Sequence, residues 1–99
     1  MIRTETQVAS VAGHRVAIWT VGDDIAQHAD HIVNYVKERS GEDRVAFSPE
    51  AKRSPCLWLQ TGDGVEAIGV GEHLALNLKT GKTAWGSTRS SAFREVIER

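Results

Sequence analysis

The sequence predicts an α+β domain: a mostly antiparallel sheet of five to seven strands with two helices packed on it, in the order ββα(β)ββββα. Three observations predict this class. Short β-favouring runs alternate between apolar and polar residues, turns that contain glycine separate them, and two other segments repeat apolar residues at helical spacing. The 99 residues (1–99) are expected to form one domain around one core.

A hairpin is predicted near the N-terminus. Residues 7–11 and 15–21 are β-favouring runs on either side of a short loop that contains Gly13. The second run is apolar on both faces, as the neighbours Ile18 and Trp19 illustrate. A strand with two apolar faces is expected at the centre of a sheet.

A helix is predicted to follow, from Asp24 to Ser40. Asp24 and Gln27 fit a capping box, in which each side chain accepts a hydrogen bond from a backbone amide at the helix start. Gly41 fits a C-terminal cap. Apolar residues recur at helical spacing and form one stripe, which predicts that the helix packs across the sheet. The stripe consists of Ile25, Ala29, Ile32, Val33 and Val36.

The segment after this helix is the least regular part of the chain. Residues 42–47 fit a short edge strand that returns from the helix. Residues 48–55 begin and end with a proline-containing pair and carry two neighbouring basic residues, Lys52 and Arg53. Because binding groups often lie on loops, residues 48–55 are a candidate contact region.

An antiparallel meander is predicted for the second half of the chain. Apolar runs at 57–60, 65–70, 74–78 and 83–85 are separated by turns, most of which contain glycine. These glycines lack the lysine and the strand-to-helix context of a phosphate-binding loop. We therefore interpret them as turns and expect no cofactor.

Alternation within the meander predicts that its second face is also partly apolar. Side chains one residue apart point to opposite faces of a strand, and this places Trp58, Ile68 and Trp85 together on the face opposite the core. The expected apolar surface is larger than two short helices cover.

A last helix is predicted near the C-terminus. Apolar residues at helical spacing form its buried stripe, and a hydroxyl side chain, Ser87 or Thr88, is expected to cap its start. The stripe consists of Ala92, Phe93, Val96 and Ile97.

Composition narrows the function classes. Lys and Arg number 12 against 13 Asp and Glu, so the chain carries no strongly signed charge for nucleic acid or an anionic membrane surface. The single cysteine cannot form an internal disulfide, and no segment resembles a signal peptide or a membrane span. We expect a cytoplasmic protein with no membrane partner.

A row of polar side chains follows the first predicted helix. Asp24, His28, His31 and Tyr35 fall nearly in one line on a cylinder of about 3.6 residues per turn. Two imidazoles and a carboxylate are typical of a divalent metal site or an acid/base pair, but the sequence has no pattern that supplies further zinc ligands. A solvated flank or a contact surface is the favoured interpretation. We assign no metal ligand and no catalytic residue, and Cys56 is expected to be a small buried residue.

These observations favour a non-catalytic protein-binding module that self-associates as a homodimer or binds another protein. Exposed apolar patches usually mark interfaces. Small size and the lack of motifs resemble accessory proteins of phages and mobile elements, including inhibitors that occlude a host machine. The expected interface residues are Trp58, Ile68, Val70, Trp85, His28, His31 and Tyr35.

Two alternatives remain. The first is a single-stranded nucleic-acid-binding domain, in which bases stack on Trp58 and Trp85. Its phosphate contacts would come from Lys52, Arg53, Lys82 and Arg89. The second is a small metal- or ligand-binding protein or enzyme that uses His28 and His31. The balanced charge makes nucleic acid the less favoured partner.

Overall fold

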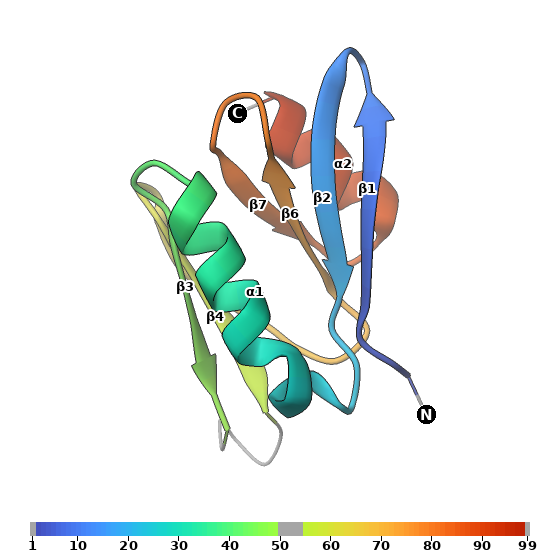
Figure 1. Cartoon of the computed structure of the whole chain (residues 1–99), viewed down its shortest axis with the longest axis vertical. Helices are drawn as coiled ribbons and strands as arrows, with labels where there is room; N and C mark the ends of the chain where they lie inside the picture. The colour runs from blue at the N-terminus through green and yellow to red at the C-terminus, as the bar shows by residue number, and fades with distance from the viewer. Residues whose placement is uncertain (1, 50–54, 99) are drawn as a thin grey trace.

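The computed structural model describes residues 2–49 and 55–98 of the chain (Figure 1). These residues form seven strands and two helices in the predicted order. The strands are β1 (Glu5–Val11), β2 (His14–Thr20), β3 (Arg44–Ser48), β4 (Cys56–Thr61), β5 (Gly64–Ile68), β6 (His73–Asn77) and β7 (Thr83–Gly86). The helices are α1 (Ile25–Arg39) and α2 (Arg89–Glu98). Neither helix is long and apolar enough to cross a bilayer.

The strands form two antiparallel sheets, one of four strands in the order β1-β2-β6-β7 and one of three in the order β3-β4-β5. The α+β class, the element order and the antiparallel pairing are confirmed, whereas the single sheet is replaced by two. The predicted meander divides between β5 and β6. Gly71 has a positive φ of 89°, and its amide donates to the carbonyl of Val21, while the Val21 amide donates to Glu72. These bonds bring the chain alongside the end of β2, so β6 joins the four-stranded sheet.

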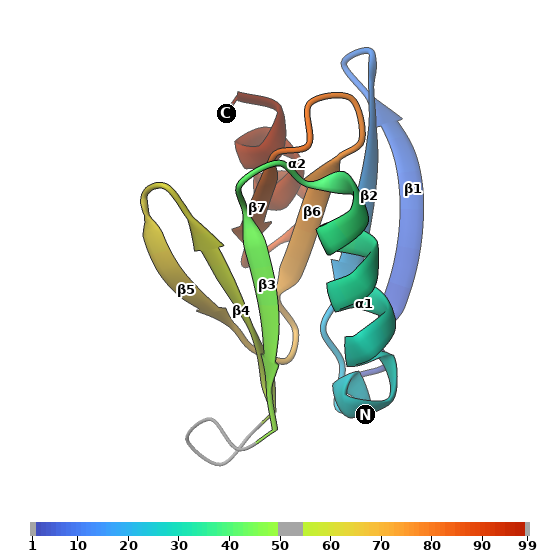
Figure 2. The same ribbon diagram turned by 60° about the vertical axis from the view of Figure 1, so that its left-hand side comes forward.

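Helix α1 lies between the two sheets (Figure 2). Its buried residues Ile25, Ile32 and Val36 join one hydrophobic core with side chains from both sheets. The three-stranded sheet contributes one face to this core, which consists of Val45, Leu57, Leu59 and Ile68. The other face of that sheet is turned away from α1.

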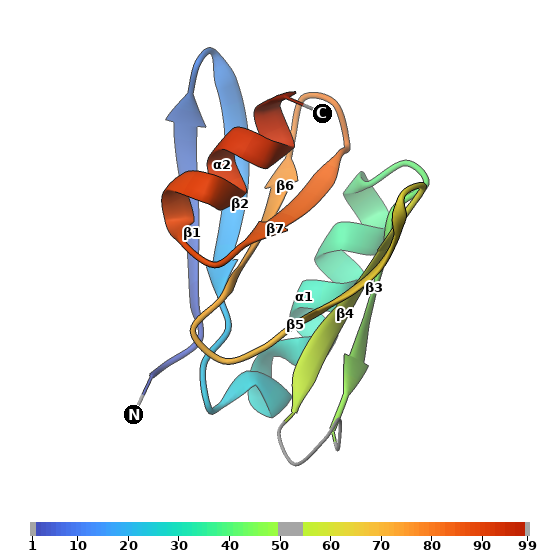
Figure 3. The ribbon, with the colours of Figure 1, turned by 180° about the vertical axis from the view of Figure 1, so that it is seen from behind.

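Helix α2 covers the opposite face of the four-stranded sheet (Figure 3). Its residues Ala92 and Val96 pack on Ile18 of β2 and Ala84 of β7 in a second buried cluster. Both faces of β2 are therefore buried, and β2 lies between β1 and β6 as predicted. The close approach of α2 to β7 depends on Gly86, because a Cβ atom at this position would be 2.5 Å from the amide nitrogen of Ala92.

The ends of the two helices differ in how well the sequence predicted them. The Thr88 hydroxyl accepts a hydrogen bond from the Ser91 amide at 3.1 Å, so Thr88 caps α2 as expected. The capping box on α1 is wrong: Asp24 is the N-cap residue, but its side chain makes no cap hydrogen bond. Its carboxylate instead accepts from the Thr4 amide at 2.7 Å. At the other end, the C-cap is Ser40, whose backbone is extended.

Candidate functional site

The predicted apolar face of Trp58, Ile68 and Trp85 does not exist. In the β4–β5 hairpin, Leu57 lies opposite Ile68 and Trp58 lies opposite Ala67. Opposite residues of an antiparallel pair point to the same side, so Ile68 shares the buried face with Leu57 and is 0% exposed. Trp58 points the other way and is 36% exposed. The prediction failed because alternation within each strand does not give the register between strands.

Two more of the expected interface residues pack on the central core. Trp85 lies on β7, in the other sheet from Trp58, and is half-buried against the core. Val70 lies in the connection between the sheets and packs against the same core. Trp58 and Trp85 therefore form no common platform.

An apolar surface lies outside the core, on the outer side of the three-stranded sheet. We call the side chains of Ala46, Trp58, Val65 and Ala67 the outer sheet face. Trp58 occupies the central strand, between Ala46 on β3 and Ala67 on β5. All four residues are exposed, Val65 by 56%. No described helix covers this side of the sheet, as Figure 2 shows.

The polar row on α1 is held by contacts within the chain. The Nε2 atom of His28 lies 3.2 Å from the Asp24 carboxylate. Hydrogen bonds from Thr4, more than the contact with His28, lower the pKa of Asp24 from 3.8 to about 2. Among residues 2–49 and 55–98, no three His, Cys, Asp or Glu side chains are placed to hold a metal ion. Asp24 and His28 are therefore a pair, and His31 does not join them in a ligand set.

Tyr35 has two aromatic neighbours and one cationic neighbour. Its ring meets the buried ring of Trp19 edge-on, with centroids 5.4 Å apart. The Arg39 guanidinium lies 3.7 Å from the Tyr35 ring centroid, and the exposed His31 ring lies 6.1 Å away. Because Trp19 and Arg39 occupy the Tyr35 ring, this part of α1 offers less free aromatic surface than the sequence suggested.

Of the four basic residues predicted to contact nucleic acid, the two that the structure describes do not lie on the sheet that carries Trp58. Lys52 and Arg53 lie outside the described residues. Lys82 lies in the loop before β7, and Arg89 begins α2, with its guanidinium 5.7 Å from the Phe93 ring centroid. Neither belongs to the three-stranded sheet that carries Trp58.

Cys56 is buried, as expected, at the start of β4. Burial raises the pKa of its thiol. A raised pKa disfavours the thiolate that nucleophilic chemistry requires.

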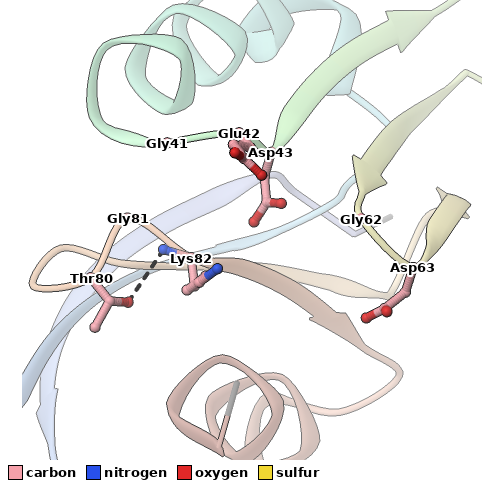
Figure 4. A pocket seen from close by; sticks show the side chains of 8 residues that line it. All are labelled: Gly41, Glu42, Asp43, Gly62, Asp63, Thr80, Gly81 and Lys82. Atoms are coloured by element: carbon pink, nitrogen blue, oxygen red, sulfur yellow. Dashed lines mark hydrogen bonds between the residues drawn. The ribbon is translucent and has the colours of Figure 1, made fainter.

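The structure also contains a cleft that the sequence did not indicate. At one end of the molecule, the loops after α1, β4 and β6 enclose a hollow of about 480 Å³ (Figure 4). A second hollow of about 420 Å³ runs from there along β7, between β5 and α2, and Asp63 lines both. We call the two hollows together the acidic cleft, after the five carboxylates that line it. They are Glu42, Asp43, Asp63, Glu66 and Glu95.

Asp43 is the most buried of these carboxylates, at 6% exposure. Its Oδ2 atom accepts hydrogen bonds from the Thr83 amide at 2.9 Å and the Thr83 hydroxyl at 2.8 Å. Its Oδ1 atom has no hydrogen-bond partner within the described part of the chain, and Figure 4 shows the carboxyl group pointing into the hollow. Asp43 therefore connects the loop after α1 to β7 and still presents one oxygen to the cleft.

Sequence inspection had no signal for this cleft. Its carboxylates come from a loop, a turn, a strand and a helix that are far apart in the chain. Each one alone is typical of a solvated surface residue. In comparisons with known proteins, no protein-family model, no curated protein and no solved structure matches the chain.

Proposed function

We propose that this chain is a non-catalytic protein-binding module that self-associates through the outer sheet face. The single observation that carries the proposal is the position of Trp58, exposed in the central strand of a sheet that no described helix or strand covers on that side. Central strands usually keep large apolar side chains on the covered face, and tryptophan is the residue most enriched at energetic centres of interfaces.

Covering Trp58 in a dimer gains enough free energy to favour association. A buried aromatic side chain removes 150–250 Å² from water, so covering the exposed third of this indole removes roughly 80 Å². At about 25 cal/mol per Å², this is worth roughly 2 kcal/mol per protomer. In a symmetric pair the gain is doubled, because each protomer presents the same surface.

The size of the outer sheet face predicts a weak dimer. Three strands about 4.8 Å apart and five residues long cover roughly 250 Å². Stable complexes bury about 800 Å² per partner. Two sheets packed face to face would cover Val65 and Trp58 but little else, so we expect a dimer that forms in the high micromolar range.

Sedimentation equilibrium over a wide concentration range tests the proposal. We expect the average mass of the native chain to rise towards that of a dimer, and Trp58→Ser to remain monomeric. Val8→Ser is the matched control, since Val8 is 45% exposed but lies on β1 of the other sheet. A native chain that stays monomeric at high micromolar concentration contradicts self-association. Equal weakening by Val8→Ser contradicts the assignment to the outer sheet face.

A further inference from the structure

Strand β1 is one edge of the four-stranded sheet and pairs only with β2 in the described sheets (Figure 1). Ala12 and Gly13, which follow it, both have positive φ, and this is typical of a two-residue hairpin turn. In such a hairpin the flanking pair, Val11 and His14, exchanges backbone hydrogen bonds, and bonded and non-bonded pairs then alternate along the ladder. The residues whose N–H and C=O groups point away from β2 are therefore Thr6, Val8 and Ser10.

The ladder on the other side of β2 agrees with this assignment. The Arg15 carbonyl accepts a hydrogen bond from the Leu78 amide at 2.8 Å, so the backbone groups of Arg15 face β6. Ser10 is the β1 residue opposite Arg15 and is not bonded to it, because a residue directs its N–H and C=O groups to one side of a strand.

The three outward residues of β1 have no backbone partner in the described part of the chain. Just before β1, the amides of Ile2 and Thr4 donate to the carboxylates of Asp23 and Asp24, at 3.0 and 2.7 Å. The outward N–H and C=O groups of β1 itself make no such contact within residues 2–49 and 55–98. This edge of the sheet is therefore open along β1.

Strand β1 also lacks the features that usually block an open edge. Proteins protect edge strands by making them short, by bulges, and by lysine or proline residues. The seven residues of β1 all pair with β2 in one continuous register, and none of them is lysine or proline. Glu5 is its one charged residue. The other edge strands, β3, β5 and β7, have only four or five residues.

An apolar hollow of about 340 Å³ lies beside the end of β1, on the side of the sheet that α2 covers. Gln7 lies opposite Ile18, which packs under α2, so every second residue from Gln7 to Val11 points to this side. A strand added beside β1 would direct alternate side chains to the same side. The residues that line the hollow are Val11, Ser90, Phe93, Arg94, Ile97 and Glu98.

A second copy of this chain fits the β1 edge poorly. Full antiparallel overlap of two β1 strands puts the first residue of one opposite the last residue of the other, so Glu5 would lie opposite Val11. A carboxylate would then be directed to the apolar hollow. Two such strands, about 24 Å long and about 10 Å thick, cover roughly 240 Å² per partner. Stable complexes bury about 800 Å² per partner.

We propose that the β1 edge binds an extended segment of another protein, which pairs antiparallel with β1 as a fifth strand. An apolar side chain of this segment enters the hollow beside Val11. In this mode of recognition, backbone hydrogen bonds provide affinity and pockets for alternate side chains provide specificity. The segment residues that bond to β1 point away from α2, and the residues between them point to α2.

Fluorescence anisotropy with a fluorescein-labelled octapeptide, in which threonine and valine alternate, tests the proposal. We expect saturable binding with the valines on the α2 side, so the threonine amides face β1. N-methylation of the threonine amides should weaken binding at least about tenfold, because it removes the donors to β1. N-methylation of the valine amides is the matched control and should change the affinity by less than about threefold. Serine in place of valine should weaken binding about tenfold, because the hollow is apolar.

A proline at Val8 tests the position of the added strand. Val8→Pro removes an outward amide that β2 does not use, and proline is tolerated at such edge positions. It should weaken peptide binding at least about tenfold, whereas Val8→Ser keeps the amide and should lose no more than about threefold. Circular dichroism and thermal unfolding check the fold of both variants. The two methylated peptides are measured on the native chain, so they decide the outcome even if Val8→Pro fails to fold.

Peptide binding and self-association are tested separately, because Trp58 lies in the other sheet. Trp58→Ser should bind the octapeptide as the native chain does, whatever its effect on the mass measured by sedimentation. No saturable binding, equal losses for the two methylated peptides, or equal losses for the two folded Val8 variants would each overturn the proposal.

Discussion

The two sheets differ in how many of their faces are covered. In β2 of the four-stranded sheet, the neighbours Ile18 and Trp19 are 2% and 0% exposed, because α2 covers one face and the central core the other. In β4 of the three-stranded sheet, the neighbours Leu57 and Trp58 are 0% and 36% exposed. Both strands are central and both carry apolar residues at successive positions. Strand composition alone therefore does not decide whether a second face is buried.

The difference follows from the number of available layers. Two sheets present four faces, and the two inner faces meet around α1. Helix α2 follows β7 directly after a short link, so it packs on the sheet that contains β7. No described element remains for the outer side of the three-stranded sheet. The outer sheet face is the consequence of this arrangement.

Displacing α2 from the four-stranded sheet should have the largest effect on the free energy of unfolding. Gly86→Ala places a methyl group against Ser91 and the backbone of Ala92, so α2 has to move away from β7. We expect a loss of at least about 3 kcal/mol in the free energy of unfolding. Urea denaturation measures this loss. Gly62→Ala is the control, since a Cβ at Gly62 meets no atom within 4 Å, and a similar loss there would contradict the explanation.

The difference between the two sheets is tested by truncating one aliphatic side chain on each: one under α2 in the four-stranded sheet and one on the outer sheet face. Ile18→Ala leaves a cavity under α2 and should cost about 3 kcal/mol. Val65→Ala on the outer sheet face should change the free energy of unfolding by less than about 0.5 kcal/mol, because Val65 is 56% exposed. Thermal or urea unfolding at low protein concentration keeps dimerisation out of the measurement. Similar costs for the two variants would show that the outer sheet face is covered in the folded monomer.

The two sheets are also joined by a polar contact, which Asp43→Ala removes. Loss of the hydrogen bonds to the Thr83 amide and hydroxyl in a buried site should cost about 2 kcal/mol. Asp43→Asn keeps an oxygen acceptor and should cost less. Glu42→Ala, at the exposed neighbouring position, is the control in the same unfolding measurement. An equal effect of Asp43→Ala and Glu42→Ala would contradict a specific role for the contact.

The smallest expected effect concerns acid stability at the start of α1. The folded pKa of Asp24, about 2, is below its ordinary value of 3.8, so the unfolded chain binds this proton first as the pH falls. The stability contributed by Asp24 is therefore fully present above pH 3.8 and is lost as the pH falls towards about 2. Asp24→Asn should flatten this part of the curve of stability against pH. Asp30→Asn, an exposed position on the same helix, should leave the curve unchanged.

Much of the fold was predictable because the signals were local. Alternation and turns that contain glycine predicted most of the strands, residues 42–47 only fitted the edge strand that became β3, and apolar spacing located both helices. The central position of β2 followed from its two apolar faces. The capping box on α1 failed because Thr4, twenty residues before Asp24, competes for the same carboxylate. Local signals do not reveal such a distant partner.

The candidate sites were much less predictable. Trp58 was expected on the face opposite the core, but its grouping with Ile68 and Trp85 required a register that only pairing between strands defines. The carboxylates of the acidic cleft lie in segments that come together only when the two sheets close around α1. No spacing along the chain marks such residues.

The sequence by itself determined the elements of this protein and their order, because backbone preference and side-chain periodicity act over a few residues. Only the tertiary structure decided that the strands divide into two sheets, that no described element covers one outer face and that distant carboxylates line one cleft. These features arise from contacts between segments that are far apart in the chain, and such contacts depend on packing and register rather than on local preference.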